Sequence, residues 1–122
     1  IPIHNVITCT KETPVKDIAW KLKEHQERRS FVVDQQGALL GIITTTDLVY
    51  KALSDCDRAS HMKAADIMEK SVKSVDVSED LDKALEIMND LKTFTCPVTD
   101  KGKIMGTISY HELLGYVAKS LG

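Results

Sequence analysis

The sequence predicts a mixed α/β (α+β) fold in which two pseudo-symmetric β-α-β-β-α repeats pack through their sheets. The first observation is an internal repeat, because GIITTTDL at residues 41–48 returns as GTISYHEL at residues 106–113. The second is an amphipathic helical pattern upstream of each copy, and the third is a glycine-containing turn between two apolar runs in each half. Since two copies cannot form an open solenoid, they indicate a closed pair.

Each half is predicted to open with a short strand and a helix. The segments Asn5–Cys9 and Val72–Val77 alternate in part between apolar and polar residues, as short strands do. Pro14 suits a first helical turn, with Thr13 as the N-cap. Apolar residues then recur at helical spacing in both halves: Val15, Ile18, Ala19 and Leu22, and then Leu81, Ala84, Leu85 and Met88.

A β-hairpin is predicted next in each half, with Gly37 and Gly102 supplying the positive φ that such turns favour. Pro97 has no N–H to donate to a neighbouring strand, so we expect it to open its strand or to lie at an edge. The motif then leads into a final helix, over about residues 46–53 in the first half and 111–120 in the second.

The repeat also predicts the domain organisation. An offset of 65 residues separates Gly41 from Gly106, which assigns residues 1–60, polar linker included, to the first repeat and residues 61–122 to the second. A short helix over residues 63–69 is expected to lead into the second repeat. One repeat alone would bury only about 60% of its chain surface, so the two are expected to fold together. The abrupt opening IPIHN indicates a piece of a longer protein.

The composition argues against several classes of function. The 122 residues carry a formal net charge of −2 without a basic patch, which disfavours nucleic-acid binding. No apolar run approaches the roughly 18–20 residues of a membrane helix, and no signal peptide is recognisable, so we expect a cytoplasmic protein without a membrane segment. Three scattered cysteines and four scattered histidines predict free thiols and no metal site. The common catalytic motifs are missing, so neither an enzyme nor a required cofactor is predicted.

Three stretches, VVDQQGALLGIITTTDLV, PVTDKGKIMGTISYHELL and AADIMEKSVKSVDVSEDLDKALEIM, together with the repeat spacing, resemble a tandem pair of CBS (cystathionine-β-synthase) domains, a Bateman module. The resemblance covers nearly the whole chain, although IPIHN stands where a short helix would usually lie. It implies a regulatory module in signal transduction that binds AMP, ADP, ATP or S-adenosylmethionine in the cleft between the repeats. It also implies a homodimer, and an attached or partner effector domain under its control.

The motif implied by the resemblance is Gly-apolar-x-Thr/Ser-x-x-Asp, whose hydroxyl contacts a phosphate and whose Asp accepts hydrogen bonds from a ribose. Gly41, Thr44 and Asp47 fill every position in the first half, with Thr46 as an extra hydroxyl. The implied role of Asp47 agrees with its chemistry, because the two oxygens of one carboxylate can accept hydrogen bonds from the two vicinal hydroxyls of a ribose. A hydroxyl beside the free N–H groups at the start of a helix likewise suits the binding of a phosphate.

The second half departs from this motif. Ser109 keeps the hydroxyl, but Glu112 replaces the Asp, and its extra methylene displaces the oxygens from the ribose position. This predicts a weakened second site, to which His111 adds a candidate phosphate donor. By position in the family, further contacts to the adenine are implied for five residues: Thr8, Cys9, Ser30, Phe31 and Val32.

Two other interpretations stay open at the level of sequence. Thr44-x-x-Asp47 and Ser109-x-x-Glu112 also satisfy the capping-box pattern, which explains these residue types without any ligand. The chain would then be a structural or dimerisation module with empty clefts. Binding of a divalent ion or a nucleic acid is a third interpretation, and both the net charge and the absence of clustered carboxylates argue against it.

Overall fold

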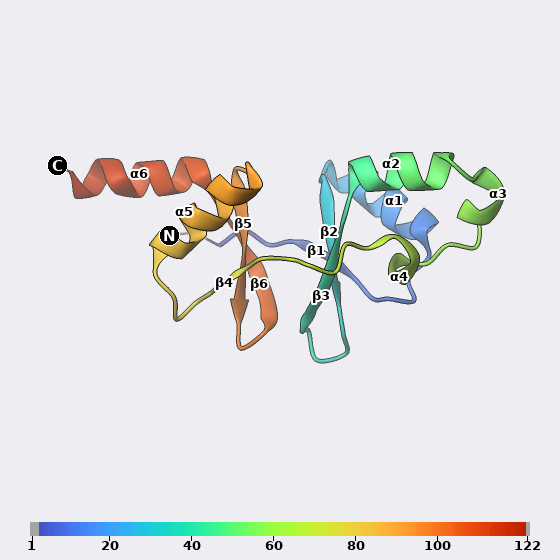
Figure 1. Cartoon of the computed structure of the whole chain (residues 1–122), viewed down its shortest axis with the longest axis horizontal. Helices are drawn as coiled ribbons and strands as arrows, with labels where there is room; N and C mark the ends of the chain where they lie inside the picture. The colour runs from blue at the N-terminus through green and yellow to red at the C-terminus, as the bar shows by residue number, and fades with distance from the viewer. Residues whose placement is uncertain (1–2, 122) are drawn as a thin grey trace. The chain divides into compact units, whose positions relative to one another are not determined.

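The computed structural model describes residues 3–121 and divides into two compact units. One unit is Ile7–Val72, and the other combines Ile1–Val6 with Lys73–Gly122. Each unit contains one three-stranded sheet with helices (Figure 1). The predicted mixed α+β fold is therefore confirmed. The first two residues of the IPIHN opening lie outside the described residues.

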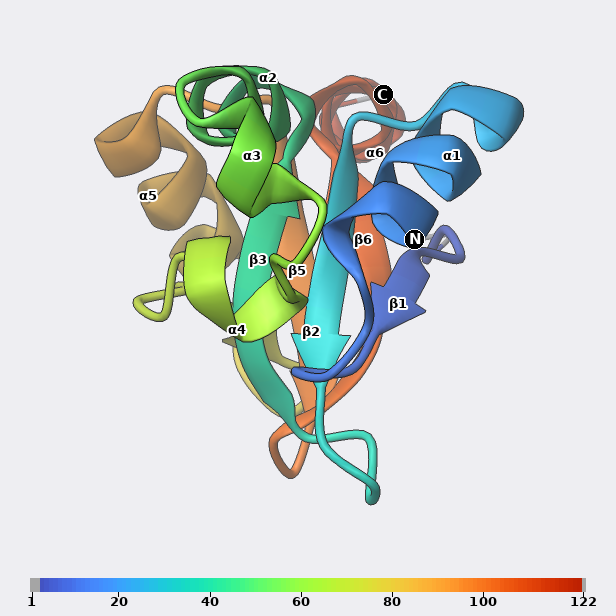
Figure 2. The same ribbon diagram turned by 90° about the vertical axis from the view of Figure 1, so that its right-hand side faces the viewer.

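The unit 7–72 is built on a sheet in which the middle strand, β2, is parallel to β1 and antiparallel to β3 (Figure 2). The parallel pair requires a crossover, which α1 supplies, whereas a short turn suffices for the antiparallel pair. Its elements in chain order are β1 (Ile7–Cys9), α1 (Val15–His25), β2 (Arg29–Val33), β3 (Leu39–Thr44), α2 (Thr45–Leu53), α3 (Cys56–Ala59) and α4 (Ala64–Ile67).

The unit that joins residues 1–6 to 73–122 repeats this plan. Its middle strand β5 is parallel to β4 and antiparallel to β6. The turn glycines Gly37 and Gly102 both have φ of +86°, as predicted for the two hairpins. Its elements in chain order are β4 (Val75–Asp76), α5 (Leu81–Leu91), β5 (Thr95–Asp100), β6 (Lys103–Ser109) and α6 (Tyr110–Ser120).

Each unit has its own core on the helix side of its sheet. The periodicity placed the buried face of α1 correctly except at Ala19, which is exposed, so the apolar stripe is narrower than predicted. On α5, Leu81 and Leu85 are half-buried and Ile87 joins the core instead. The first core includes Val15, Ile18, Leu22, Val32, Ile43, Leu48, Ala64 and Ile67. The second includes Val75, Ala84, Ile87, Met88, Cys96, Val98, Ile108 and Leu113.

The predicted N-cap of α1 is wrong by one residue. The helix begins at Val15 with Pro14 as its N-cap, and Pro14 provides no side-chain hydrogen bond. The hydroxyl of Thr13 is used in the preceding turn, where it accepts a bond of 3.0 Å from the Thr10 N–H. Thr13 therefore stabilises the turn between β1 and α1 rather than the helix itself.

The prediction for Pro97 is also wrong, because this residue lies inside the middle strand β5, opposite Thr107. The N–H and C=O of Thr107 bond to His4, so they point away from β5, and Pro97 and Thr107 form a pair without mutual hydrogen bonds. On its other side, Pro97 precedes the short stretch where β4 pairs with Val98 and Thr99. The missing N–H of Pro97 therefore removes no bond of the sheet.

In each unit a short segment from elsewhere in the chain extends the sheet at its third strand. His4 exchanges two backbone hydrogen bonds with Thr107 of β6, at 2.8 and 3.0 Å. Glu69, which is 65 residues after His4, exchanges two bonds of 2.9 Å with Ile42 of β3. Residues 1–6 thus belong to the unit with 73–122, and α4 belongs to the unit 7–72. The ranges 1–60 and 61–122 remain a prediction about the sequence repeat, which is distinct from these compact units.

Candidate functional site

The two copies of the motif lie where the third strand of each sheet runs directly into a helix. Strand β3 ends at Thr44, whose Oγ1 accepts a bond of 3.1 Å from the Asp47 N–H, and this caps α2. Strand β6 ends at Ser109, whose Oγ accepts a bond of 3.2 Å from the Glu112 N–H, and this caps α6. The N-cap role of both hydroxyls is therefore confirmed, whereas the reciprocal side-chain bond of a full capping box is not found for Asp47 or Glu112 within residues 3–121. The cap places each motif carboxylate in the first helical turn, where the helix dipole favours negative charge.

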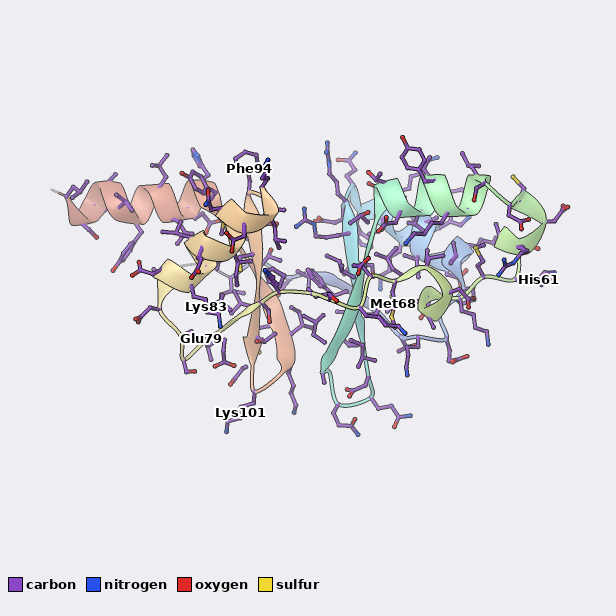
Figure 3. The ribbon with its side chains drawn as sticks, in the orientation of Figure 1. His61, Met68, Glu79, Lys83, Phe94 and Lys101 are labelled. Atoms are coloured by element: carbon purple, nitrogen blue, oxygen red, sulfur yellow. The ribbon has the colours of Figure 1, made fainter. Side chains whose placement is uncertain are left out.

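The glycines at the head of the motif make room for the added backbone segments. A Cβ on Gly41 would lie 2.8 Å from the Glu69 carbonyl oxygen and 3.0 Å from Sδ of Met68, the residue that follows α4 (Figure 3). A Cβ on Gly106 would lie 2.2 Å from the His4 carbonyl oxygen, and Gly106 has a φ of +154°. Close packing of the chain thus requires both glycines, whether or not a ligand is bound.

The two motif carboxylates have different neighbours. The Asp47 side chain is 32% exposed, and Lys51 Nζ lies 3.9 Å from its Oδ1. This separation is an ion pair rather than a hydrogen bond, so the lone pairs of Asp47 remain suited to other donors. In the other unit, His4 Nε2 contacts Glu112 Oε1, and Glu112 Oε2 is buried without a partner among the described residues.

The residues predicted to contact adenine separate onto the two faces of the first sheet. Side chains of Val32 and Ile43 enter the core, so the alternation of strands also directs Cys9 and Ser30 toward the helices. Thr8 pairs with Phe31, which is fully buried but lies outside that core. By the same alternation, these two residues share the opposite face with Ile42 and Thr44.

Ser30 and Cys9 are neighbours on the core face. Ser30 is fully buried, and its hydroxyl has no partner of good hydrogen-bond geometry within residues 3–121. Burial raises the pKa of the Cys9 thiol, an effect that the nearby Ser30 hydroxyl partly opposes. A protonated, half-buried thiol is a poor nucleophile, so this pair does not form a reactive cysteine site.

Thr46 and His111 lie in the first turns of α2 and α6, and both residues are exposed. The sequence reasoning missed His4, because it treated IPIHN only as a departure from the repeat. The signal was present in the 65-residue offset, which aligns His4 with Glu69 and so with the segment that pairs with β3. Among the residues described, no cluster of three or more His, Cys, Asp or Glu side chains could hold a metal ion.

Comparison with known proteins connects this geometry to a family. The CBS domain model matches the chain twice, at residues 1–54 and 64–119. An uncharacterized protein of Methanopyrus kandleri is 30% identical over 112 residues, and the match covers 91% of this chain and 57% of that protein. An uncharacterized 17.7 kDa protein of Acidianus ambivalens is 33% identical over 114 residues, covering 93% and 68% respectively. The chain therefore spans little more than half of the first relative.

Solved structures agree with the family match. The CBS-domain protein ATU1752 of Agrobacterium tumefaciens shares 25% identity with a TM-score of 0.72, covering 92% of this chain and 89% of that chain. The CBS domain pair of protein MJ0100, solved with 5′-methylthioadenosine and S-adenosyl-L-methionine, has a TM-score of 0.73 at 23% identity and covers 98% and 99%. No helix within residues 3–121 has the length and apolar character needed to cross a membrane. The chain belongs to the CBS domain family, as a tandem pair of CBS domains.

Proposed function

We propose that this chain is a regulatory module that senses an adenosine-containing ligand, namely AMP, ADP, ATP or S-adenosylmethionine, through Asp47. The observation that carries the proposal is the placement of a partly exposed carboxylate in the first turn of α2, beside a hydroxyl cap and with no cation hydrogen-bonded to it among residues 3–121. Two proteins of the same fold support the ligand class. The MJ0100 pair holds S-adenosyl-L-methionine and 5′-methylthioadenosine, and the cytosolic domain of the Mg²⁺ channel MgtE holds ATP.

Each residue of the proposed site has a defined task. Asp47 accepts both ribose hydroxyls, since a carboxylate offers two oxygens. The hydroxyls of Thr44 and Thr46 and the Thr46 N–H receive a phosphate at the start of α2, where the Thr45 and Asp47 N–H groups are already bonded within the chain. Thr8 and Phe31 contact the adenine, because they lie on the same sheet face as Thr44. Cys9, Ser30 and Val32 are weaker candidates for that contact, since their side chains are directed toward the core, and Gly41 serves the backbone approach of Glu69.

The regulatory step is a shift of population. A ligand that binds one conformation more tightly than another raises the share of that conformation, by no more than its difference in affinity allows. An attached or partner effector domain then responds to the favoured conformation. The module itself performs no reaction and needs no cofactor, since the ligand acts as a signal. A cytoplasmic location and the presence of an attached or partner effector domain remain predictions from the sequence.

The proposal is tested by calorimetric titration of AMP, ATP and S-adenosylmethionine into the wild type and into Asp47→Asn. Saturable binding of one of these ligands that is lost in Asp47→Asn supports the site. Asp90→Asn, an exposed carboxylate on α5, is the matched control and should bind as the wild type does. At 100 times its Kd the ligand should also stabilise the fold by about 2.7 kcal/mol. Folded protein that binds none of the three ligands contradicts the proposal.

A second candidate function is a structural module that forms homodimers. It is favoured by exposed apolar side chains on two helices, which are Val49, Tyr50 and Leu53 on α2 and Leu114, Val117 and Leu121 on or just after α6. Analytical ultracentrifugation of the wild type, Tyr50→Lys and Leu114→Lys tests this candidate. Dimers that persist without a ligand and dissociate in one of these variants support it, whereas a monomeric wild type excludes it.

A further inference from the structure

The motif carboxylate of the unit that contains β6 is engaged by the N-terminal segment of the chain. His4 Nε2 contacts Glu112 Oε1, although the two residues are 108 positions apart in the sequence. The two backbone bonds between His4 and Thr107 fix the segment beside the start of α6. One oxygen of Glu112 therefore accepts from the imidazole before any ligand arrives.

The second oxygen of Glu112 is in a different position. Oε2 is buried and has no partner among residues 3–121, and the whole side chain is 24% exposed. A buried acceptor without a donor is unfavourable, so Oε2 favours a single incoming donor. A vicinal diol, by contrast, needs both oxygens of one carboxylate. Glu112 in contact with His4 can hold one hydroxyl but not the pair.

The unit 7–72 has no imidazole at the position that corresponds to His4. Glu69 occupies the position of His4 and makes the equivalent two backbone bonds, here with Ile42. A carboxylate has no proton to donate to Asp47 when both are ionised. Asp47 is the more exposed of the two motif carboxylates, at 32% against 24%, and within residues 3–121 its ion pair is with Lys51, whose Nζ lies 3.9 Å from Oδ1.

We propose that His4 determines how many ligand molecules the chain binds. By holding Oε1 of Glu112, it confines the recognition of a vicinal diol to Asp47, so the chain binds one ribose-containing ligand instead of two. This inference rests on the proposed function. His4 is a specificity-determining residue, and it acts through Glu112 rather than by contact with the ligand.

The test is the number of AMP molecules bound per chain, measured by calorimetry. We expect one in the wild type, two in His4→Ala, none in Asp47→Ala and one in the His4→Ala/Asp47→Ala double variant. His4→Ala leaves both backbone bonds to Thr107 in place. Glu112→Asp, which retracts the carboxylate from His4, is expected to give two as well. His25→Ala is the matched control, since it removes an exposed imidazole from the other unit and should leave one.

The possible outcomes separate this inference from the proposed function. Two molecules per wild-type chain, or one in both His4→Ala and Glu112→Asp, overturns the role of His4 while the proposed function stands. No binding to any of the folded proteins overturns the proposed function, and the inference with it. The contact itself has an independent readout, since the ¹⁵N resonances of the His4 ring should move in Glu112→Gln. Unchanged resonances overturn the inference whatever the calorimetry shows.

Discussion

The unit 7–72 and the unit that joins residues 1–6 to 73–122 have the same sheet order and the same glycine constraint, but they surround the motif carboxylate differently. Lys51 Nζ lies 3.9 Å from Asp47 Oδ1, whereas the His4 ring contacts Glu112 through Nε2 and Oε1. The backbone features that fix the fold are repeated in both units, and the side chains that decide ligand recognition are not. The comparison teaches that a repeated motif implies a repeated structure, while each copy needs its own test of function.

The helix side of the two units differs as well. In the unit 7–72, α4 buries Ala64 and Ile67 in the core, and Lys51 Nζ donates a bond of 2.8 Å to the Ile67 carbonyl. The other unit has Tyr116 at the position of Lys51, beside a hollow of about 320 Å³. Its apolar lining includes Val75, Val77, Leu81, Val98 and Ile108. Tyr116 therefore borders open space, whereas Lys51 reaches the backbone of α4 in the unit 7–72.

The largest expected effect is that of Gly106→Ala, which places a methyl group 2.2 Å from the His4 carbonyl at a φ of +154°. We expect a loss of about 3 kcal/mol in the free energy of unfolding, measured by urea denaturation, because backbone must move. Gly41→Ala should cost less, about 2 kcal/mol, since part of its contact is the flexible Met68 side chain. Gly115→Ala is the control, with nothing within 4 Å of the added atom. It should raise stability by up to about 1 kcal/mol, and an equal loss in all three variants would contradict the argument.

Truncation of Ile67 should lower the free energy of unfolding by about as much as Gly41→Ala does. This side chain is 3% exposed, so Ile67→Ala is expected to cost about 2 kcal/mol by loss of burial and creation of a cavity. Val77→Ala, at the hollow of the other unit, removes a side chain that is 50% exposed and should cost about 0.5 kcal/mol or less. Chemical denaturation of the two variants measures the difference. Equal costs would contradict the expectation that the buried side chain contributes more than the half-exposed one.

Removal of the hydroxyl caps should have a smaller and similar effect in both units. Thr44→Ala and Ser109→Ala each leave a helix N–H without its acceptor, with an expected cost of about 1 kcal/mol. The effect on ligand binding should differ, because only Thr44 belongs to the proposed site. Thermal unfolding measures the first effect, and AMP titration measures the second. A loss of affinity in Ser109→Ala equal to that in Thr44→Ala would contradict the assignment of one site per chain.

The smallest expected effect is on stability at acidic pH. It should differ between the units, because the turn before the first helix is held by different groups in each. Thr10 and Thr13 hydroxyls form it in the unit 7–72, whereas Asp76 and Glu79 carboxylates form it in the other unit. Hydrogen bonds from the Ser78 hydroxyl and backbone, and then from Lys101, lower the pKa of Asp76. The pKa of Glu79 is lowered mainly by a hydrogen bond from Lys83, whose Nζ lies 2.6 Å from Glu79 Oε2 (Figure 3).

The direction of this pH dependence follows from the lowered pKa values. Their contribution to stability is complete above the ordinary values of 3.8 and 4.5, and it is lost as pH falls through the lower folded-state values. The Asp76→Asn/Glu79→Gln variant should therefore lose less stability than the wild type between pH 6 and about pH 3. Urea denaturation at the two pH values measures this. Identical losses would show that the two carboxylates contribute nothing to the acid sensitivity.

Features that depend on residues close in sequence could be predicted. The hairpin glycines and the Thr44 and Ser109 caps each involve neighbours within a few positions, and their residue types reveal them. The prediction for Pro97 failed because the residue is tolerated through its register, opposite a Thr107 whose backbone groups bond to His4 and not to β5. The contact of His4 with Glu112 likewise depends on the pairing of His4 with Thr107 of β6, which lies more than 100 residues away in the sequence, and no local pattern encodes that pairing. The sequence therefore predicts the two motifs well and their immediate environments poorly.

The two-piece construction of one unit has a consequence for how the protein folds during synthesis. Residues 1–6 leave the ribosome before the whole of the unit 7–72, yet their partner strand β6 follows far later. Domains generally fold as their chain becomes available, and all of the unit 7–72 has been made while the backbone groups of His4 still lack their partners. Closure by so distant a pairing is entropically slow. The segment that contains His4 can therefore pair only after β6 has been made, and a chain that lacked this segment would leave β6 without its added neighbour.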